Sequence, residues 1–259
     1  MKNKWWNLVI ILGVYFLFRL VVIVINEFGL IPIMNNFIFW ETVLELAIIL
    51  IMFSVNHWIV KQKIDFRFNI KSPFLSLGPV FFLMVILFSV MLSDRLPRTY
   101  GNTLPLALSA GFFEEYLCRG LLFPQIFQAL SEKKERNFNQ VYLAIFLSSL
   151  IFSSLHLLNL RTQDLPTTLM QMWEALCAGI FFSALYLAAN SLLPSILFHF
   201  LFDFIGMYTK GPVQQRVQVN SASLKSIAII TLIFLGYSLL LINKKKLSKQ
   251  FAWVNNLIS

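Results

Sequence analysis

Apolar stretches of bilayer length dominate this sequence. A helix of about 20 apolar residues crosses the roughly 30 Å hydrocarbon core of a membrane, so each such stretch predicts one transmembrane helix. The sequence predicts eight of them: Trp5 to Asn26, Phe37 to Val60, Phe74 to Leu92, Leu104 to Leu130, Asn139 to Leu158, Thr168 to Ala189, Ser191 to Tyr208 and Leu224 to Ile242.

The composition supports the same fold class. The chain is 58% hydrophobic, and its mean hydropathy is +0.74. Charged residues make up 13% of it, which is about half of the roughly 25% found in soluble domains. The polar connections are too short to fold alone. We therefore expect an all-α polytopic membrane protein, a bundle of about eight transmembrane helices that forms a single membrane domain over residues 1–259.

The net charge of +9 reports topology rather than nucleic-acid binding. Basic residues are distributed by loop and do not gather on one face with aromatic residues between them. If the amino terminus is cytoplasmic, most of them fall in the four inner segments, at positions 2–4, 61–71, 133–136 and 244–249. This asymmetry follows the positive-inside rule for an even number of spans. It predicts a multi-pass protein of the cell membrane with both termini in the cytoplasm, in contact with the lipid bilayer and its anionic headgroups.

Three ionisable residues stand out within the fourth predicted span. Glu114 and Glu115 are adjacent, and Arg119 follows one helical turn later. A charge at the bilayer centre costs roughly 2.5 to 3.5 kcal/mol on insertion scales, which makes a functional role the default reading. Glu115 and Arg119 are spaced i, i+4 and can pair on one face, while Glu114 points about 100° away. Glu114 lies about 15 Å into the helix that begins at Leu104, which places it near mid-membrane.

Two other spans carry histidines. His156 ends the run Phe152-Ser-Ser-Leu-His156, while His199 and Asp203 are spaced i, i+4 in the seventh span. We expect the fourth, fifth and seventh spans to bring these groups together at one buried polar site. Such a set suffices for hydrolysis, with a base to activate water and donors for an oxyanion. The same residues could form a metal site or a proton path, and spacing alone does not separate these alternatives.

These three motifs, in this order, resemble the signature of the CAAX prenyl protease and bacteriocin-processing family of intramembrane proteases, whose bacterial branch is often called Abi. The resemblance covers roughly residues 104–207, which would form the catalytic core. It implies an eight-helix membrane bundle and an intramembrane endopeptidase. Its substrate would be a membrane-associated or secreted peptide or protein.

The resemblance also implies roles for individual residues. Glu114 would activate the attacking water with help from His156, and Glu115 with Arg119 would form a supporting ion pair. His199 would stabilise the oxyanion. The family has Asn or Asp four residues after this histidine, and we assign Asp203 an orienting role because an ionised carboxylate would repel an oxyanion. The sequence has no HExxH motif, so we expect no required metal. The alternative is a divalent metal such as zinc, bound by Glu114, His156 and His199.

Other interpretations remain open from the sequence. The scaffold could serve a non-catalytic membrane immunity or regulatory partner, or an ion-coupled transporter, although we find no matching broken helices in two halves. The Lys-, Asn-, Ile- and Phe-rich composition suggests a bacterial source, where processing of bacteriocins or pheromones, or immunity to them, would fit. Glu41 and Glu45 are expected as partners for Arg19, and Pro124 is expected to kink the fourth helix.

Overall fold

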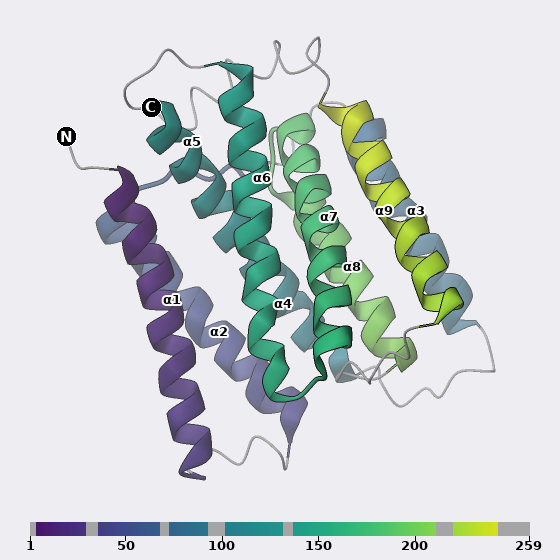
Figure 1. Cartoon of the computed structure of the whole chain (residues 1–259), viewed down its shortest axis with the longest axis horizontal. Helices are drawn as coiled ribbons and strands as arrows, with labels where there is room; N and C mark the ends of the chain where they lie inside the picture. Colours follow the sequence, from purple (N-terminus) through teal and green to yellow (C-terminus); the bar gives the residue numbers. More distant parts are fainter. Residues whose placement is uncertain are drawn as a thin grey trace.

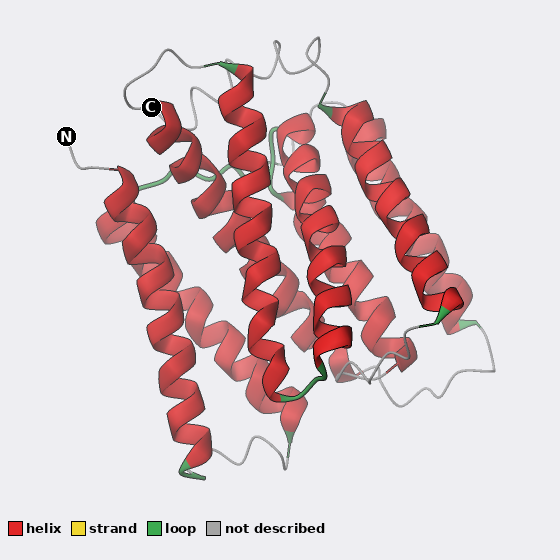
Figure 2. Ribbon diagram, viewed as in Figure 1, coloured by secondary structure: helices red, strands yellow, loops and turns green. Residues whose placement is uncertain are grey.

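The computed structural model describes residues 4–29, 36–67, 73–92, 102–131, 137–210 and 220–242. This part of the chain is helical apart from short connections (Figure 2). It contains eight helical runs, which confirms the predicted all-α class. The helices are α1 Lys4–Glu27, α2 Phe37–Val55 with the π-helix η2 Asn56–Val60, α3 Pro73–Met91, α4 Leu104–Glu115 with the π-helix η4 Tyr116–Leu122 and α5 Phe123–Ser131, α6 Phe138–Leu155 with the 3-10 helix η5 His156–Arg161, α7 Leu165–Ala189, α8 Leu193–Lys210 and α9 Ser221–Leu241.

Six of these helical runs, counted over the described residues, are long and apolar enough to cross a membrane. They are α1, α2 with η2, α3, α6 with η5, α7 and α9. Large apolar side chains on their outer faces are exposed, among them Phe74, Phe81 and Leu232. Water would not tolerate so continuous an apolar surface, whereas lipid does. The chain is therefore a multi-pass membrane protein.

The helices run alternately up and down the bundle (Figure 1). As a result, the beginning of α1 and the end of α9 lie at the same end of the molecule, as an even number of spans requires. Which membrane face this end occupies stays a prediction from the distribution of Lys and Arg.

The centre of the bundle is formed by α7 and by the run from α4 through η4 to α5. In α7, 72% of the span is buried, against 17% in α1 and α9. Every residue of η4 is buried. Polar groups in these central elements are therefore shielded from lipid by the surrounding helices.

Two glycines allow the central helices to approach closely. A Cβ atom added to Gly111 of α4 would lie 2.9 Å from the backbone nitrogen of Phe200 in α8. A Cβ atom added to Gly179 of α7 would lie 2.8 Å from Cβ of Ser149 in α6. Real Cβ atoms essentially never make contacts this short, so any larger residue would push these helices apart.

The irregularity expected at Pro124 begins earlier in the chain. The α-helical pattern changes to a π-helix at Tyr116, and the backbone N–H of Phe123 donates to the carbonyl of Cys118, five residues back. Proline has no N–H to continue such a ladder, so the π-helix ends just before it. The distortion therefore directly follows the acidic pair, and π-helical turns are frequent at functional sites.

The segment 61–67 after η2 packs against the ends of several helices. Gln62 Oε1 accepts a hydrogen bond of 2.8 Å from Gln125 Nε2 in α5. The carbonyl of Asp65 accepts a bond of 2.8 Å from the backbone N–H of Leu192, just before α8. These bonds tie the connection between α2 and α3 to the helices that carry the polar site.

Candidate active site

The adjacent glutamates are the last two residues of α4. Glu115 Oε1 lies 2.7 Å from Nη1 of Arg119, one turn along in η4, which confirms the predicted i, i+4 pair. The side chains of Glu115 and Arg119 are 0% and 1% exposed. An ion pair this deeply buried would be costly without further partners, so its surroundings decide whether it is stable.

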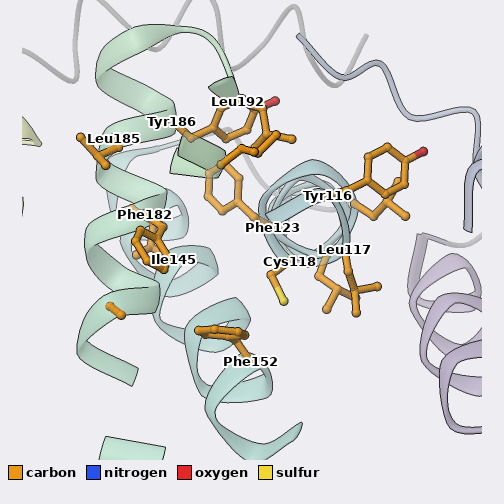
Figure 3. Close-up of a cluster of buried hydrophobic side chains, with 14 of the residues drawn as sticks. Tyr116, Leu117, Cys118, Phe123, Ile145, Phe152, Phe182, Leu185, Tyr186 and Leu192 are labelled. Atoms are coloured by element: carbon orange, nitrogen blue, oxygen red, sulfur yellow. The ribbon is translucent and has the colours of Figure 1, made fainter. Parts of the chain in front are cut away.

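Two aromatic rings enclose the Arg119 guanidinium. Its central carbon lies 4.6 Å from the ring centroid of Phe152 and 5.0 Å from that of Phe182. Figure 3 shows Phe152 on α6 and Phe182 on α7, both close to the helix that carries Cys118. Cation–π contacts of a desolvated arginine contribute about 2 kcal/mol. Thus α6 and α7 fix the cation that holds Glu115 in place.

His199 of α8 connects the two glutamates. Its Nδ1 lies 2.9 Å from Glu115 Oε1, so an Nδ1–H donates to this carboxylate. Its Nε2 lies 3.4 Å from Glu114 Oε2 and 3.4 Å from Asp203 Oδ2. The structure therefore brings Glu114, Glu115, His199 and Asp203 together, with one nitrogen of the imidazole turned to the buried ion pair and the other to two carboxylates.

The rings of Phe152 and Phe182 also hold the His199 imidazole. Phe182 stacks on it with centroids 4.7 Å apart, and Phe152 meets it edge to face at 5.9 Å. The same two phenylalanines thus contact both Arg119 and His199. They fix the relative positions of the cation and the imidazole.

His156 lies at the edge of this group. It is the first residue of η5, and its Nδ1 lies 3.2 Å from the carbonyl oxygen of Phe152. Its ring meets the Phe152 ring edge to face at 5.2 Å. It interacts electrostatically with His199 and Asp203. Among the hydrogen bonds of the described residues, none joins His156 to Glu114, so the two are not in direct contact.

Exposure separates the roles that the carboxylates can take. The side chains of Glu114 and Asp203 are 29% and 27% exposed, whereas that of Glu115 is fully buried. A partly exposed charge at mid-membrane depth is stable against water and not against hydrocarbon. Glu114 and Asp203 therefore form the edge of the site that a water molecule can reach.

A second polar cluster lies on α1 and α2. Arg19 Nη2 lies 2.7 Å from Glu45 Oε1, which confirms the expected pairing with an acidic residue of the second span; Glu41 makes no ion pair among the described residues. Arg19 Nε donates to the hydroxyl of Tyr15 at 3.3 Å. The Tyr15 ring stacks on Phe113 with centroids 6.0 Å apart, and Phe113 directly precedes Glu114.

The donor geometry does not fit a metal ion. Within the described ranges, no three His, Cys, Asp or Glu side chains are arranged to hold one, the alternative set of Glu114, His156 and His199 included. His199 Nδ1 is engaged by Glu115, and His156 Nδ1 is engaged by the Phe152 carbonyl. No chemical step is therefore assigned to a metal, and the expectation that none is required stays a prediction.

Comparison with known families bears on the same residues. Residues 96–205 match the family model described as type II CAAX prenyl endopeptidase Rce1-like. This segment is Rce1-like. The match confirms the resemblance to the CAAX prenyl protease family, and it includes all six residues singled out from the sequence. Helices α1, α2 and α9 lie outside the Rce1-like segment. No curated protein and no solved structure matches the chain.

Several residues of the site carry no signal in the sequence. Phe182 is one of 27 phenylalanines, and nothing in its neighbourhood distinguishes it from those that face lipid. Gly111, Gly179 and Tyr15 are equally inconspicuous. Their importance follows from interhelical distances, which single-sequence periodicity does not encode.

Proposed function

We propose that this protein is an intramembrane endopeptidase that hydrolyses a peptide bond of a membrane-associated or secreted peptide or protein. The observation that carries the proposal is the environment of His199. A buried ion pair holds one of its nitrogens, and two partly exposed carboxylates face the other. The Rce1-like segment, whose family is one of proteases, supports the same class of reaction.

Glu114 is the general base in this proposal. Glu115 is sealed from water by Arg119 and His199, whereas Glu114 shares only its longer contact with His199 and is partly exposed. A carboxylate in this position can take a proton from water as the oxygen attacks the substrate carbonyl. His156 assists from the edge of the site. Because its Nδ1–H donates to the Phe152 carbonyl, its Nε2 is left to exchange a proton with water.

His199 stabilises the oxyanion of the tetrahedral intermediate. With Nδ1–H donated to Glu115, an Nε2–H facing Glu114 and Asp203 remains as the donor. When negative charge develops on the substrate oxygen, this N–H can turn to it at no cost of reorganising the ring, which the two phenylalanines hold. Asp203, at 3.4 Å from Nε2, orients the ring and balances its charge in the resting state. After collapse of the intermediate, the proton held by Glu114 passes to the leaving amine.

The decisive experiment compares cleavage of candidate membrane-associated peptides by the purified wild-type protein and by Glu114→Gln. Loss of a general base typically reduces the rate by about 10²- to 10⁴-fold. Glu27→Gln is the matched control, because Glu27 lies at the exposed end of α1 and pairs only with Arg161. A Glu114→Gln protein that folds and cleaves at the wild-type rate would disprove the mechanism.

A further inference from the structure

The ion pair between Arg19 and Glu45 lies deep in the bundle but outside the Rce1-like segment. Arg19 is about 22 Å along α1 from Lys4, at 1.5 Å per residue, and therefore far from either membrane surface. Charges at this depth are expensive and usually mark a pathway or a binding site. The catalytic mechanism proposed above uses neither residue.

This pair adjoins Glu114. Tyr15 accepts the hydrogen bond from Arg19 and stacks on Phe113, the residue before Glu114. Both Tyr15 and Glu45 interact electrostatically with Glu114. Glu114 is thus approached by the Arg19 cluster from α1 and α2, whereas His199 and Asp203 approach it from α8.

The pair has hydrogen-bonding capacity that the chain does not use. The Arg19 side chain is 22% exposed, against 9% for Glu45. Arg19 uses Nε and Nη2, and among the described residues nothing accepts from Nη1. The second oxygen of Glu45 is buried and no described donor reaches it. A guanidinium has five N–H donors in a fixed plane, so an unused edge of Arg19 is available to an incoming acceptor.

We infer that Arg19 is a substrate-binding residue, which donates a hydrogen bond to a backbone carbonyl of an extended peptide segment lying beside Glu114. This inference rests on the proposed peptidase function and extends it to the recognition of substrate. A peptide must unwind for its carbonyl to be attacked, and each backbone group left unsatisfied in the membrane costs several kcal/mol. Arg19 supplies one of the donors that the unwound segment needs.

The charge balance favours a neutral carbonyl over a carboxylate as the acceptor. Glu45 neutralises Arg19 at 2.7 Å, and Glu41 also interacts electrostatically with both of them. An additional anion would meet two carboxylates around one guanidinium. A peptide carbonyl needs only the N–H that the pair leaves unused, and Glu45 keeps the guanidinium plane oriented toward it.

A purely structural role for the pair predicts a different result, and removing both charges separates the two. Arg19→Met alone would leave Glu45 uncompensated and would disturb the fold under either role. Arg19→Met combined with Glu45→Met removes both charges at similar volume, and replacing a buried pair by apolar residues is often neutral or stabilising. The matched control is the second interhelical ion pair, Arg161–Glu27, also at 2.7 Å but exposed. It is replaced in the same way.

The experiment measures binding in a Glu114→Gln background, so that cleavage does not enter. The probe is the tightest binder from a panel of dye-labelled apolar peptides, its affinity is read by fluorescence anisotropy, and thermal unfolding checks the fold. We expect the Arg19/Glu45 double variant to unfold like its parent and to bind roughly 10- to 100-fold more weakly, the range for a hydrogen bond from a charged donor. The Arg161/Glu27 variant should bind unchanged.

Equal affinity of the two double variants would overturn the inference, as would failure of every peptide to bind the parent. A peptide that binds through Arg19 but is never cleaved by the protein with Glu114 restored would leave this inference standing and contradict the proposed peptidase. With a cleaved peptide, the Arg19/Glu45 double variant should raise KM more than it lowers kcat. A purely structural role predicts no such split.

Discussion

Replacing Gly179 by alanine should impair the chemical step without touching any reacting group. The added Cβ would lie 2.8 Å from Cβ of Ser149 and 3.0 Å from Nη2 of Arg119. Ordinary contacts begin at about 3.4 Å, so α6, α7 or the guanidinium must move by roughly half an ångström or more, and overpacking of this kind costs about 1 to 3 kcal/mol. Arg119 is confined by Phe152 and Phe182, so its shift is passed to Glu115 and from there to His199.

The expected kinetic result follows from that chain of contacts. Displacement of a catalytic group by about 1 Å can reduce the rate by up to roughly 10²-fold. We expect Gly179→Ala to lower kcat by about 10- to 100-fold and to change KM by less than about threefold, because the substrate-binding surface is unaltered. The assay is steady-state cleavage by the detergent-purified protein, with thermal unfolding measured in parallel.

Three other glycines serve as matched controls. Gly13, Gly206 and Gly236 lie within helices, and nothing lies within 4 Å of the position that an added Cβ atom would take. Alanine at such sites stabilises a helix by about 0.5 to 1 kcal/mol relative to glycine. Ser149→Gly removes the nearest obstructing atoms, so it should restore part of the kcat lost in Gly179→Ala. If Gly179→Ala behaves like the three controls, the packing argument for Arg119 is wrong.

Other predictions concern the same network. Arg119→Lys keeps the charge but loses the planar group between the two rings, so the free energy of unfolding should fall by about 1 to 3 kcal/mol and kcat should drop, measured against Arg161→Lys. Gly111→Ala should destabilise the protein more than Gly206→Ala in a thermal unfolding assay, because its Cβ would meet the backbone of α8 at 2.9 Å. Asp203→Asn should retain more activity than Asp203→Ala, because the amide oxygen can still accept from His199 Nε2; equal losses would exclude an orienting role. Incubation with a chelator should leave the cleavage rate within about twofold, since the proposed steps use Glu114 and His199; a loss restored by zinc would contradict this.

The membrane spans could be predicted closely because apolar length is a property of each segment alone. The first span is predicted as Trp5 to Asn26 and observed as Lys4–Glu27, and the seventh is predicted as Ser191 to Tyr208 and observed as Leu193–Lys210. Pairing within one helix was equally accessible. The i, i+4 spacing of Glu115 and Arg119 fixes their common face whatever the neighbouring helices do.

Contacts between helices were only partly predictable. The three motifs indicate that the fourth and seventh spans meet, but not which nitrogen of His199 faces which glutamate, because that depends on the rotation of α8 about its axis. His156 shows the limit most clearly. The change from α6 to a 3-10 helix at this residue leaves its Nδ1 on the Phe152 carbonyl, and no periodicity in the sequence indicates where the α-helical pattern ends.

The division of labour between two identical neighbours, Glu114 and Glu115, follows from their positions at the end of α4. Successive side chains on a helix diverge by about 100°, so adjacent glutamates cannot share one environment. Glu115 turns to the centre of the bundle, where Arg119 and His199 bind the same oxygen and its side chain is 0% exposed. Glu114 turns to the edge, where it stays 29% exposed and meets the other nitrogen of the same imidazole. Exchanging the two environments would require rotating α4 against α8, which the close approach at Gly111 prevents. Packing, rather than residue type, therefore decides that the first glutamate is the one available to water.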